Sequence, residues 1–407
     1  MQNWLLLGGF VLSGLLGLII LPNILFVSHK KHLFDMPDAR KVHTAPVPRL
    51  GGLAFLPVIL VTVFLIMGIY LFVTDFQNTP SLVRFFQMLM FLFAGMTLLY
   101  LVGEADDLVG VGYRYKFLVQ TVAAALIVLS GNWLGSFAGL FGIEDVPAWI
   151  GMPVTILAII FITNAINLID GIDGLASGLS IISLLTLTVL LLMNSSFSYT
   201  LFAVATLGIV LVFWFYNVFG NAMKGHKLFM GDTGSLTLGY ILSFLTIHLS
   251  QDISGEHGKW QMIVAFSSLL VPMFDVVRVS LHRIRKGRSP FLPDKNHIHH
   301  KLIRAGMKKT GHVLVTILGI DLFFIVFNAL LAGRLNITLL LFCDIAIYTS
   351  LQFIINRFIR KNNGGPSYIP VEELAESEPE LAKELGLDKV GDTIPDKLGE
   401  SDNGKAN

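Results

Sequence analysis

The sequence predicts an all-α, polytopic integral membrane protein, and three observations support this prediction. Hydrophobic residues make up 54% of the 407 residues, and charged residues only 14%. The mean hydropathy of +0.71 is far too high for a water-soluble chain of this length. Apolar segments of about 20 residues, the length that crosses a hydrocarbon core, recur along most of the chain. The net charge of +1 gives no indication of a nucleic-acid partner.

We expect eleven membrane-spanning helices. The first, residues 4–27, is longer than a signal-peptide core and lacks a basic leading region and a small-residue cleavage site, so we expect it to be retained. The other ten are expected at residues 52–74, 84–103, 117–134, 151–169, 175–193, 199–219, 234–250, 259–281, 312–331 and 336–357. Residues 135–150 are too short and interrupted to span, and we expect them to form an interfacial segment.

The positions of Lys and Arg predict the orientation in the membrane. The connections that follow the second, fourth, sixth, eighth and tenth predicted spans lie on one side of the membrane. Of the 29 basic residues, only Arg84, Lys259 and Arg334 lie in or beside these connections, which leaves 26 on the other side. The positive-inside rule makes that side cytoplasmic, so the N-terminus is expected outside and the C-terminus in the cytoplasm. Residues 1–358 then form a transmembrane domain with five cytoplasmic loops, and residues 359–407 an acidic, disordered cytoplasmic tail. The single cysteine, Cys343, excludes an intramolecular disulfide and a Cys-based metal site.

The first two cytoplasmic loops combine basic and acidic side chains. The first, DMPDARKVHTAPVPRLGG, places Arg49 beside a glycine pair, where it could bind phosphate or act only as a topological anchor. The second, GEADDLVGVGYRYK, carries Asp106 and Asp107 at the end of an apolar helix and continues to Lys116. Adjacent carboxylates repel each other, and a hard cation such as Mg²⁺ removes that conflict. The alternative is a solvated loop start, which does not require acids against the bilayer.

The third loop, NAINLIDGIDGLASG, carries two carboxamides and two carboxylates. Asn164, Asn167, Asp170 and Asp173 follow one another at three-residue intervals, so on a helix they would lie close to one face. Packing alone does not explain four such polar groups between two spans. The pattern therefore favours a binding or catalytic site.

The fourth loop contains the sequence FMGDTGS just before a predicted span. The turn could offer backbone N–H groups to an anion, and Asp232 could bind a metal. Phe229 is an aromatic residue that could stack on a nucleobase. The alternative is a helix cap formed by Asp232 and Thr233, and the two interpretations do not exclude each other.

The fifth loop is the richest in cationic side chains. Asp275 and Arg278 occupy the last turns of a span, and a basic run including Arg283 follows. Three histidines then fall within four positions, at His297, His299 and His300. Basic side chains and imidazoles suit a diphosphate whose charge shifts during a reaction. A His-rich zinc site is the competing interpretation, but the acids elsewhere favour a harder ion.

The motifs NLIDGIDGL, FMGDTGS and RKGRSPFLPDKNHIHH resemble those of the polyprenyl-phosphate N-acetylhexosamine-1-phosphate transferases, glycosyltransferase family 4, which include phospho-MurNAc-pentapeptide translocase. The resemblance is strongest to the bacterial undecaprenyl-phosphate GlcNAc-1-phosphate transferases. It covers about residues 28–310, including all five loops, but not the tail. It implies a multi-pass protein of the bacterial inner membrane whose active site faces the cytoplasm and whose transmembrane domain is catalytic.

The resemblance also implies roles for individual residues. The expected catalytic residues are Asp106, Asp107, Asp170, Asp173, His297, His299 and His300. The substrate-binding residues that it implies are Asn167, Phe229 and Arg283, and the expected metal ligands are Asp232 and Asp107. Lys116 and Arg49 are further expected substrate-binding residues, from the basic parts of the first two loops. The metal would be Mg²⁺, with Mn²⁺ as an alternative. Many family members have a third aspartate where this chain has Gly110, so no role is expected for a third acid there.

The implied reaction transfers an N-acetylhexosamine-1-phosphate, here GlcNAc-1-phosphate, from a UDP-sugar to undecaprenyl phosphate and releases UMP. It would be the first membrane step of a cell-envelope polysaccharide such as O-antigen. The expected partners are undecaprenyl phosphate, a UDP-N-acetylhexosamine and the bilayer, without nucleic acid; a homodimer is left open.

A transporter for a nucleotide-sugar or another anion is the main alternative. Transporters tend to place ionisable groups near the bilayer midplane, whereas most acids here lie at the ends of predicted helices; Asp321 and Asp344 are exceptions. A non-catalytic scaffold would not explain the aspartate loops.

Overall fold

The computed structural model describes residues 1–34, 46–74, 80–251, 258–287 and 296–363, and nearly all of them are helical. The acidic tail and most of the first loop lie outside the described residues. The helices and 3-10 turns before the hairpin are α1 (Gln2–Lys31), η1 (Gly51–Ala54), α2 (Phe55–Val73), α3 (Pro80–Val109) and α4 (Tyr113–Leu129). Those after it are α5 (Ala148–Ile169), α6 (Leu175–Met193), α7 (Phe197–Phe219), η2 (Ala222–Lys224), α8 (Gly231–Leu249), α9 (Gly258–Ser267), α10 (Leu270–Arg285), α11 (Ile298–Arg304), α12 (Thr310–Leu331) and α13 (Ile337–Asn363).

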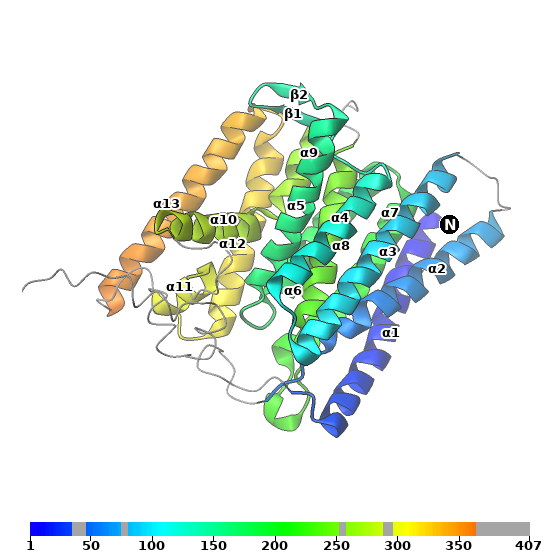
Figure 1. The fold of residues 1–407 in the computed structure, drawn as a ribbon, viewed down its shortest axis with the longest axis horizontal. Helices are drawn as coiled ribbons and strands as arrows, with labels where there is room; N and C mark the ends of the chain where they lie inside the picture. Colours follow the sequence, from blue (N-terminus) through cyan, green and yellow to red (C-terminus); the bar gives the residue numbers. More distant parts are fainter. Residues whose placement is uncertain (35–45, 75–79, 252–257, 288–295, 364–407) are drawn as a thin grey trace, which may run out of the picture.

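The long helices lie side by side in one bundle (Figure 1), and each of the eleven predicted spans coincides with a helix or with the pair α9 and α10. Among the described residues, eight helices are long and apolar enough to cross a membrane, or nine if the bent pair counts as one span. The chain is therefore a multi-pass membrane protein. The remaining two predicted spans are α4, which has only 17 residues, and α8, which is almost wholly buried within the bundle. A helix enclosed by other helices does not need an apolar surface toward lipid.

The all-α prediction holds apart from one small hairpin, at the end of the bundle far from the five motif-bearing loops. Strands β1 (Ser136–Leu140) and β2 (Ile143–Asp145) pair antiparallel within the segment expected to be interfacial. The Lys259 ammonium contacts the Glu144 carboxylate at 2.8 Å, and the Thr338 hydroxyl accepts the Phe141 N–H at 2.7 Å. Two later helices thus fasten the hairpin to the bundle.

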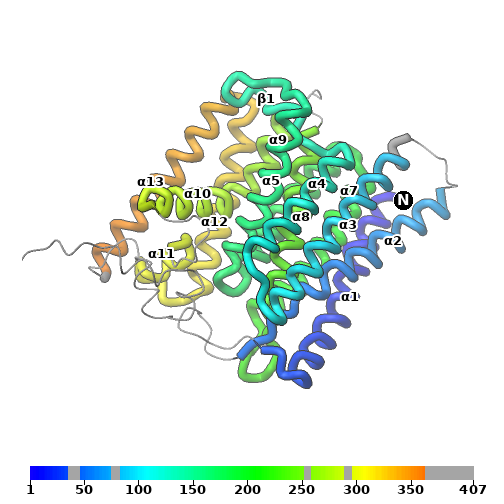
Figure 2. The backbone as a smooth tube through the Cα atoms, in the orientation of Figure 1, coloured from blue at the N-terminus to red at the C-terminus, as the bar shows by residue number. Residues whose placement is uncertain are grey.

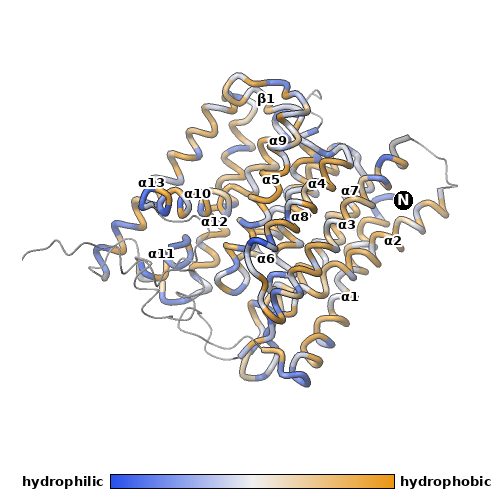
Figure 3. Tube along the Cα trace, in the orientation of Figure 1, coloured by the Kyte–Doolittle hydropathy of each residue, from blue (hydrophilic) through white to orange (hydrophobic). Residues whose placement is uncertain are grey.

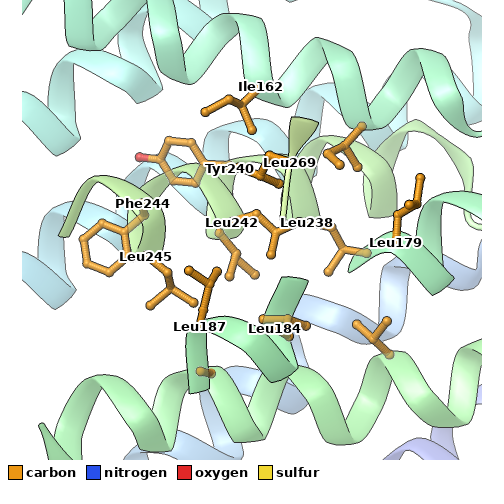
Figure 4. Close-up of a cluster of buried hydrophobic side chains, with 14 of the residues drawn as sticks. Ile162, Leu179, Leu184, Leu187, Leu238, Tyr240, Leu242, Phe244, Leu245 and Leu269 are labelled. Carbon is orange, nitrogen blue, oxygen red and sulfur yellow. The ribbon is translucent and has the colours of Figure 1, made fainter. Parts of the chain in front are cut away.

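Helix α8 forms the centre of the packing. Its side chains Tyr240, Leu242 and Leu245 face Ile162 of α5 and Leu187 of α6 (Figure 4). Lipid tails are as apolar as these side chains, so helices in a membrane associate through close packing instead of through the hydrophobic effect. Glycines permit that packing: a Cβ on Gly239 would lie 2.6 Å from Thr163 Cα, and one on Gly103 would lie 2.5 Å from Thr233 Cα.

The segment predicted as one span at 259–281 is instead two helices, α9 and α10, bent by 60°. Pro272 in the first turn of α10 has no N–H to continue a helix, and the Ser268 hydroxyl bonds the Ala265 carbonyl at 2.8 Å at the break. As a result, α10 runs across the direction of α12 and α13 (Figure 2). Hydrophilic residues gather along α10 and α11 and at the adjoining end of the bundle (Figure 3).

Candidate active site

The site begins where the first and fourth loops join through their backbones. The Phe229 N–H donates to the Pro48 carbonyl at 2.8 Å, and the Gly51 N–H donates to the Phe229 carbonyl at 2.9 Å. The Gly52 N–H continues the ladder to the Met230 carbonyl at 2.8 Å. This short ladder holds Phe229 and the exposed Arg49 beside the first turn of α8.

Asp107, at the end of α3, caps the N-terminus of α8. One carboxylate oxygen accepts the Asp232 N–H at 2.8 Å, and the other accepts the Thr233 N–H at 3.0 Å and the Thr233 hydroxyl at 2.7 Å. A carboxylate at this position satisfies free N–H groups and the positive end of the helix dipole. The cap is therefore supplied from another helix. The alternative interpretation of this turn, a local cap formed by Asp232 or Thr233, is wrong. Both oxygens of the predicted metal ligand Asp107 are already engaged.

Lys116, in the first turn of α4, lies between the other two acids of this region. Its ammonium is 3.1 Å from an Asp106 oxygen and 2.9 Å from an Asp232 oxygen. Asp106 Oδ1 also accepts the Val111 N–H at 2.8 Å. The two carboxylates are thus arranged around a single cation that the chain itself provides.

The same pair of carboxylates fits a divalent metal by its chemistry. Within the described parts of the chain, no group of three or more His, Cys, Asp or Glu side chains is placed to hold a metal ion. Mg²⁺, however, commonly uses only one or two carboxylates and takes its other ligands from water and substrate phosphates. Asp106 and Asp232 offer hard oxygen donors around one cation position, so they could hold Mg²⁺. Asp107 accepts three hydrogen bonds from α8, which leaves its Oδ1 the more accessible oxygen for a metal.

The third loop begins where the predicted span 151–169 ends, so of its four evenly spaced polar residues only the two asparagines lie on a helix. Helix α5 ends at Ile169, Asp170 occupies the capping position, and Asp173 lies in the following turn. The Lys227 ammonium contacts Asp173 at 2.5 Å, and Asn167 donates to the Ser235 hydroxyl of α8 at 2.8 Å.

The first polar residue of this loop, Asn164, has a packing role. Its amide nitrogen donates to Gln120 of α4 at 2.5 Å. Asn167, Asp170 and Asp173 therefore belong to the site, while Asn164 joins two helices.

Asp170 has the electrostatics of a carboxyl that exchanges its proton near neutrality. Although its side chain reaches the surface, surrounding protein atoms desolvate it, and the nearby charge of Asp232 adds to this effect. Together they raise the pKa of Asp170 to about 7, with Arg49 opposing the shift.

The segment that carries His297, His299 and His300, called the histidine segment below, packs against the third loop. His299 is buried, and a methyl group on Gly171 would overlap its imidazole. Neither ring nitrogen of His299 has a hydrogen-bond partner among the described residues, and burial lowers its pKa well below the usual value. The rings of His299 and His300 lie 4.2 Å apart, and Arg283 is buried in the last turn of α10. The histidines and the third loop thus meet at the same end of the bundle as Lys116 and Asp232. The individual roles of the predicted site residues stay predictions.

Sequence reasoning missed several polar residues that support this end of the bundle. Lys227 contacts Asp173, and Lys301 donates to Gln352 of α13 at 2.8 Å. Burial lowers the pKa of Lys301 to about 7. Tyr348, also on α13, donates to Asp275 of α10 at 3.3 Å. The spacing of Asp275 and Arg278 is a recognisable helical pair, but no local pattern marks the residues of α13.

Gly110, the departure from the family pattern, terminates α3. Its φ is +73°, in the left-handed region that glycine adopts without strain, and its N–H donates to the Asp106 carbonyl at 2.9 Å. A third aspartate here would strain this turn.

Gly171→Ala should strongly impair any activity of the site, because the added methyl group displaces His299 from the third loop. We expect a loss of about 100-fold in turnover, typical of misplacing a reacting group by about 1 Å. Gly311→Ala on α12 is the matched control, because nothing lies within 4 Å of a Cβ there. Equal turnover of the two variants would contradict the placement of His299. Turnover is measured on purified protein at saturating substrate.

Comparisons with known proteins identify the family of the chain. The profile of Glycosyl transferase family 4 matches residues 88–250. The chain is 35% identical over 85% of its length, and over 90% of the relative, to a probable undecaprenyl-phosphate N-acetylglucosaminyl 1-phosphate transferase of Bacillus subtilis (strain 168). It is 31% identical to the undecaprenyl-phosphate alpha-N-acetylglucosaminyl 1-phosphate transferases of Yersinia pestis and Salmonella typhi, over 72% of this chain and 75% of each relative. The prediction from the motifs is confirmed: the chain belongs to glycosyl transferase family 4.

Proposed function

We propose that the protein transfers GlcNAc-1-phosphate from UDP-GlcNAc to undecaprenyl phosphate and releases UMP. The observation that carries the proposal is the convergence of acids, cations and histidines from five loops at one end of a membrane bundle. The printed names of the relatives describe the same transfer, and nothing in the structure favours a transporter. Phosphate transfer to a lipid uses such a set of groups at a membrane surface.

The chain's own residues account for most of the chemistry. A phosphate monoester is largely dianionic at neutral pH, so the lipid phosphate needs little help from a base. Asp106 orients it or removes its remaining proton, while Lys116 and Arg49 screen the charge. An oxygen of the lipid phosphate forms a bond to the β-phosphorus as the bond from β-phosphorus to the bridging oxygen breaks, and UMP leaves with the electron pair. Mg²⁺ held by Asp106 and Asp232 would add charge stabilisation on the diphosphate.

We favour this single in-line displacement over a two-step route through an aspartyl-phosphate. Asp170 is the candidate nucleophile for the second route. Incubation with UDP-GlcNAc labelled in the β-phosphate, without lipid, distinguishes the routes. A labelled protein band would overturn the single displacement, and its absence together with normal transfer would support it.

The activity is tested by UMP release. Purified protein with Mg²⁺, undecaprenyl phosphate and a panel of UDP-sugars should release UMP fastest with UDP-GlcNAc. Chelation with EDTA should stop release, and added Mg²⁺ or Mn²⁺ should restore it. Release with none of the sugars would contradict the proposal and favour a transporter.

We further propose eleven crossings of the bacterial inner membrane, with the N-terminus outside and the site in the cytoplasm. Basic residues concentrated at the site end support this orientation. Met223, exposed at the site end, and Ile143, exposed on the hairpin, provide single-cysteine probes in a Cys343→Ser background. An impermeant maleimide added to intact cells should label the Ile143 probe alone; labelling of only the Met223 probe would reverse the orientation.

Removal of residues 365–407 should leave turnover within about twofold of the full chain. Every motif that carries the proposed chemistry lies upstream of the tail. The measurement compares UMP release by equal amounts of the two purified proteins. A loss of tenfold or more would give the tail a part in catalysis.

A further inference from the structure

Asp275 on α10 is a fully buried carboxylate with four hydrogen-bond donors around it. Oδ2 accepts from His297 Nδ1 at 2.8 Å. Oδ1 accepts from the Arg278 guanidinium at 2.8 Å, the Ile298 N–H at 3.0 Å and the Tyr348 hydroxyl at 3.3 Å. The carboxylate therefore joins α10 to the start of the histidine segment and to α13.

These contacts determine which nitrogen of His297 carries a proton. An ionised carboxylate can only accept hydrogen bonds, and the contact with Arg278 favours the ionised form. Nδ1 must therefore be the protonated nitrogen. In neutral imidazole, this leaves Nε2 with the lone pair. Among the described residues, the ring of His297 forms its hydrogen bond through Nδ1, to Asp275.

The Nε2 atom belongs to a ring that is close to the proposed chemistry. The rings of His297 and His299 are parallel within 5°, with centroids 6.1 Å apart. His299 in turn packs on Gly171, the neighbour of Asp170. The guanidinium of Arg278 also donates to the Asn296 carbonyl at 2.5 Å, so the residue before His297 is held from the same side.

We propose that Asp275 is a positioning residue that fixes His297 as the Nδ1–H tautomer, so that Nε2 is available to a phosphate oxygen of the substrates. Nε2 accepts the remaining proton of a monoanionic lipid phosphate and keeps it, so the resulting imidazolium donates a hydrogen bond to a phosphate oxygen. Asp106 then has only to orient the lipid phosphate. The proposal rests on the proposed transfer reaction. It assigns Asp275 a part in catalysis that acts through His297 and not by contact with substrate.

A purely structural Asp275 would only fasten the histidine segment to α10 and α13. Asp275→Asn separates the two roles, because the amide has nearly the same shape. If its oxygen stays with Arg278 and Ile298, its NH₂ group faces His297 Nδ1 and forces that nitrogen to accept. The tautomer of His297 is then reversed while the packing is retained. In the Ser-His-Asp triad of serine proteases, the corresponding change from aspartate to asparagine gives the wrong histidine tautomer and lowers kcat by about 10⁴-fold.

The first readout is spectroscopic. The ¹⁵N shifts of ¹⁵N-histidine-labelled protein in detergent distinguish the two tautomers, and the His297→Gln variant identifies the signals of His297. We expect Nδ1 to be protonated in the wild-type protein and Nε2 in Asp275→Asn. A wild-type His297 protonated at Nε2 alone would overturn the proposal. This measurement does not depend on activity. Failure of the wild-type protein to release UMP would count against the proposed function, and the tautomer of His297 would still test the role of Asp275.

The second readout is kinetic. Asp275→Asn should lower kcat by about 100-fold or more while KM for UDP-GlcNAc stays within about twofold, and Asp275→Glu should recover part of the loss. Asp344→Asn is the matched control, because Asp344 is another buried carboxyl, bonded to Asn328 at 3.1 Å, and should keep wild-type kcat and His297 tautomer.

A double variant tests whether Asp275 acts through His297. Combining Asp275→Asn with His297→Gln should be no slower than His297→Gln alone, because the histidine on which Asp275 acts is already absent. Multiplicative losses in the double variant would overturn the proposal. If Asp275→Asn does not fold, the wild-type ¹⁵N shifts still decide the matter.

Discussion

Asp232→Asn should abolish transfer, with a loss of at least about 1,000-fold, while the protein still inserts and folds. The substitution removes one of the two negative charges that flank Lys116, at 2.9 Å from the ammonium. Removing a single preorganised electrostatic group commonly costs this much in the catalytic rate. The Asp232 side chain forms no cap for α8, so the helix start remains intact. UMP release by purified protein measures the loss.

Asp145→Asn provides the control for this experiment. Asp145 is an exposed acid on β2 at the opposite end of the bundle. Its loss changes the total charge equally but leaves the site untouched, so wild-type turnover is expected. Full activity of Asp232→Asn would count heavily against the proposed site.

Asp107→Asn should abolish transfer and also destabilise the protein, which distinguishes it from Asp232→Asn. The amide oxygen can replace only one of the two accepting oxygens, and the NH₂ group then faces donors at the start of α8. Loss of a helix cap costs about 0.5–2 kcal/mol. We expect a lower Tm in detergent together with loss of UMP release.

Thr233→Val is the companion variant, because it removes only the hydroxyl bond of 2.7 Å to Asp107. It should lower the Tm less than Asp107→Asn and retain measurable transfer. An Asp107→Asn protein with wild-type Tm but no activity would instead show that Asp107 acts directly on metal or substrate, as the family resemblance implies.

The helices and the loops that carry the candidate site could be predicted because they depend on local patterns. Long apolar runs predict spans, and polar motifs between them identify loops that must share one side of the membrane. The break before α10 was hidden, because Ser267, Ser268 and Pro272 interrupt an otherwise apolar run only slightly. The end of α5 at Ile169, by contrast, agrees with the predicted span 151–169, because the apolar run stops there.

The supporting contacts could not be predicted because they depend on how distant helices meet. Asp107 reaches α8 across more than a hundred residues of sequence, and its neighbour Asp106 faces Lys116 instead. Nothing in the sequence indicates which of two adjacent aspartates points which way. Tyr348 likewise lies in an apolar helix where nothing in the surrounding sequence indicates its hydrogen bond to Asp275.

The residues of the proposed site are spread along the chain, so they are synthesised at very different times. The proposed site uses Arg49, near the beginning, and His299, behind nine of the predicted spans, and Tyr348 of the last helix supports it. A nascent chain halted at residue 250 would contain everything that the family profile matches, yet lack the histidine segment. Partly synthesised chains should therefore be unable to consume either substrate until almost the entire bundle has entered the membrane.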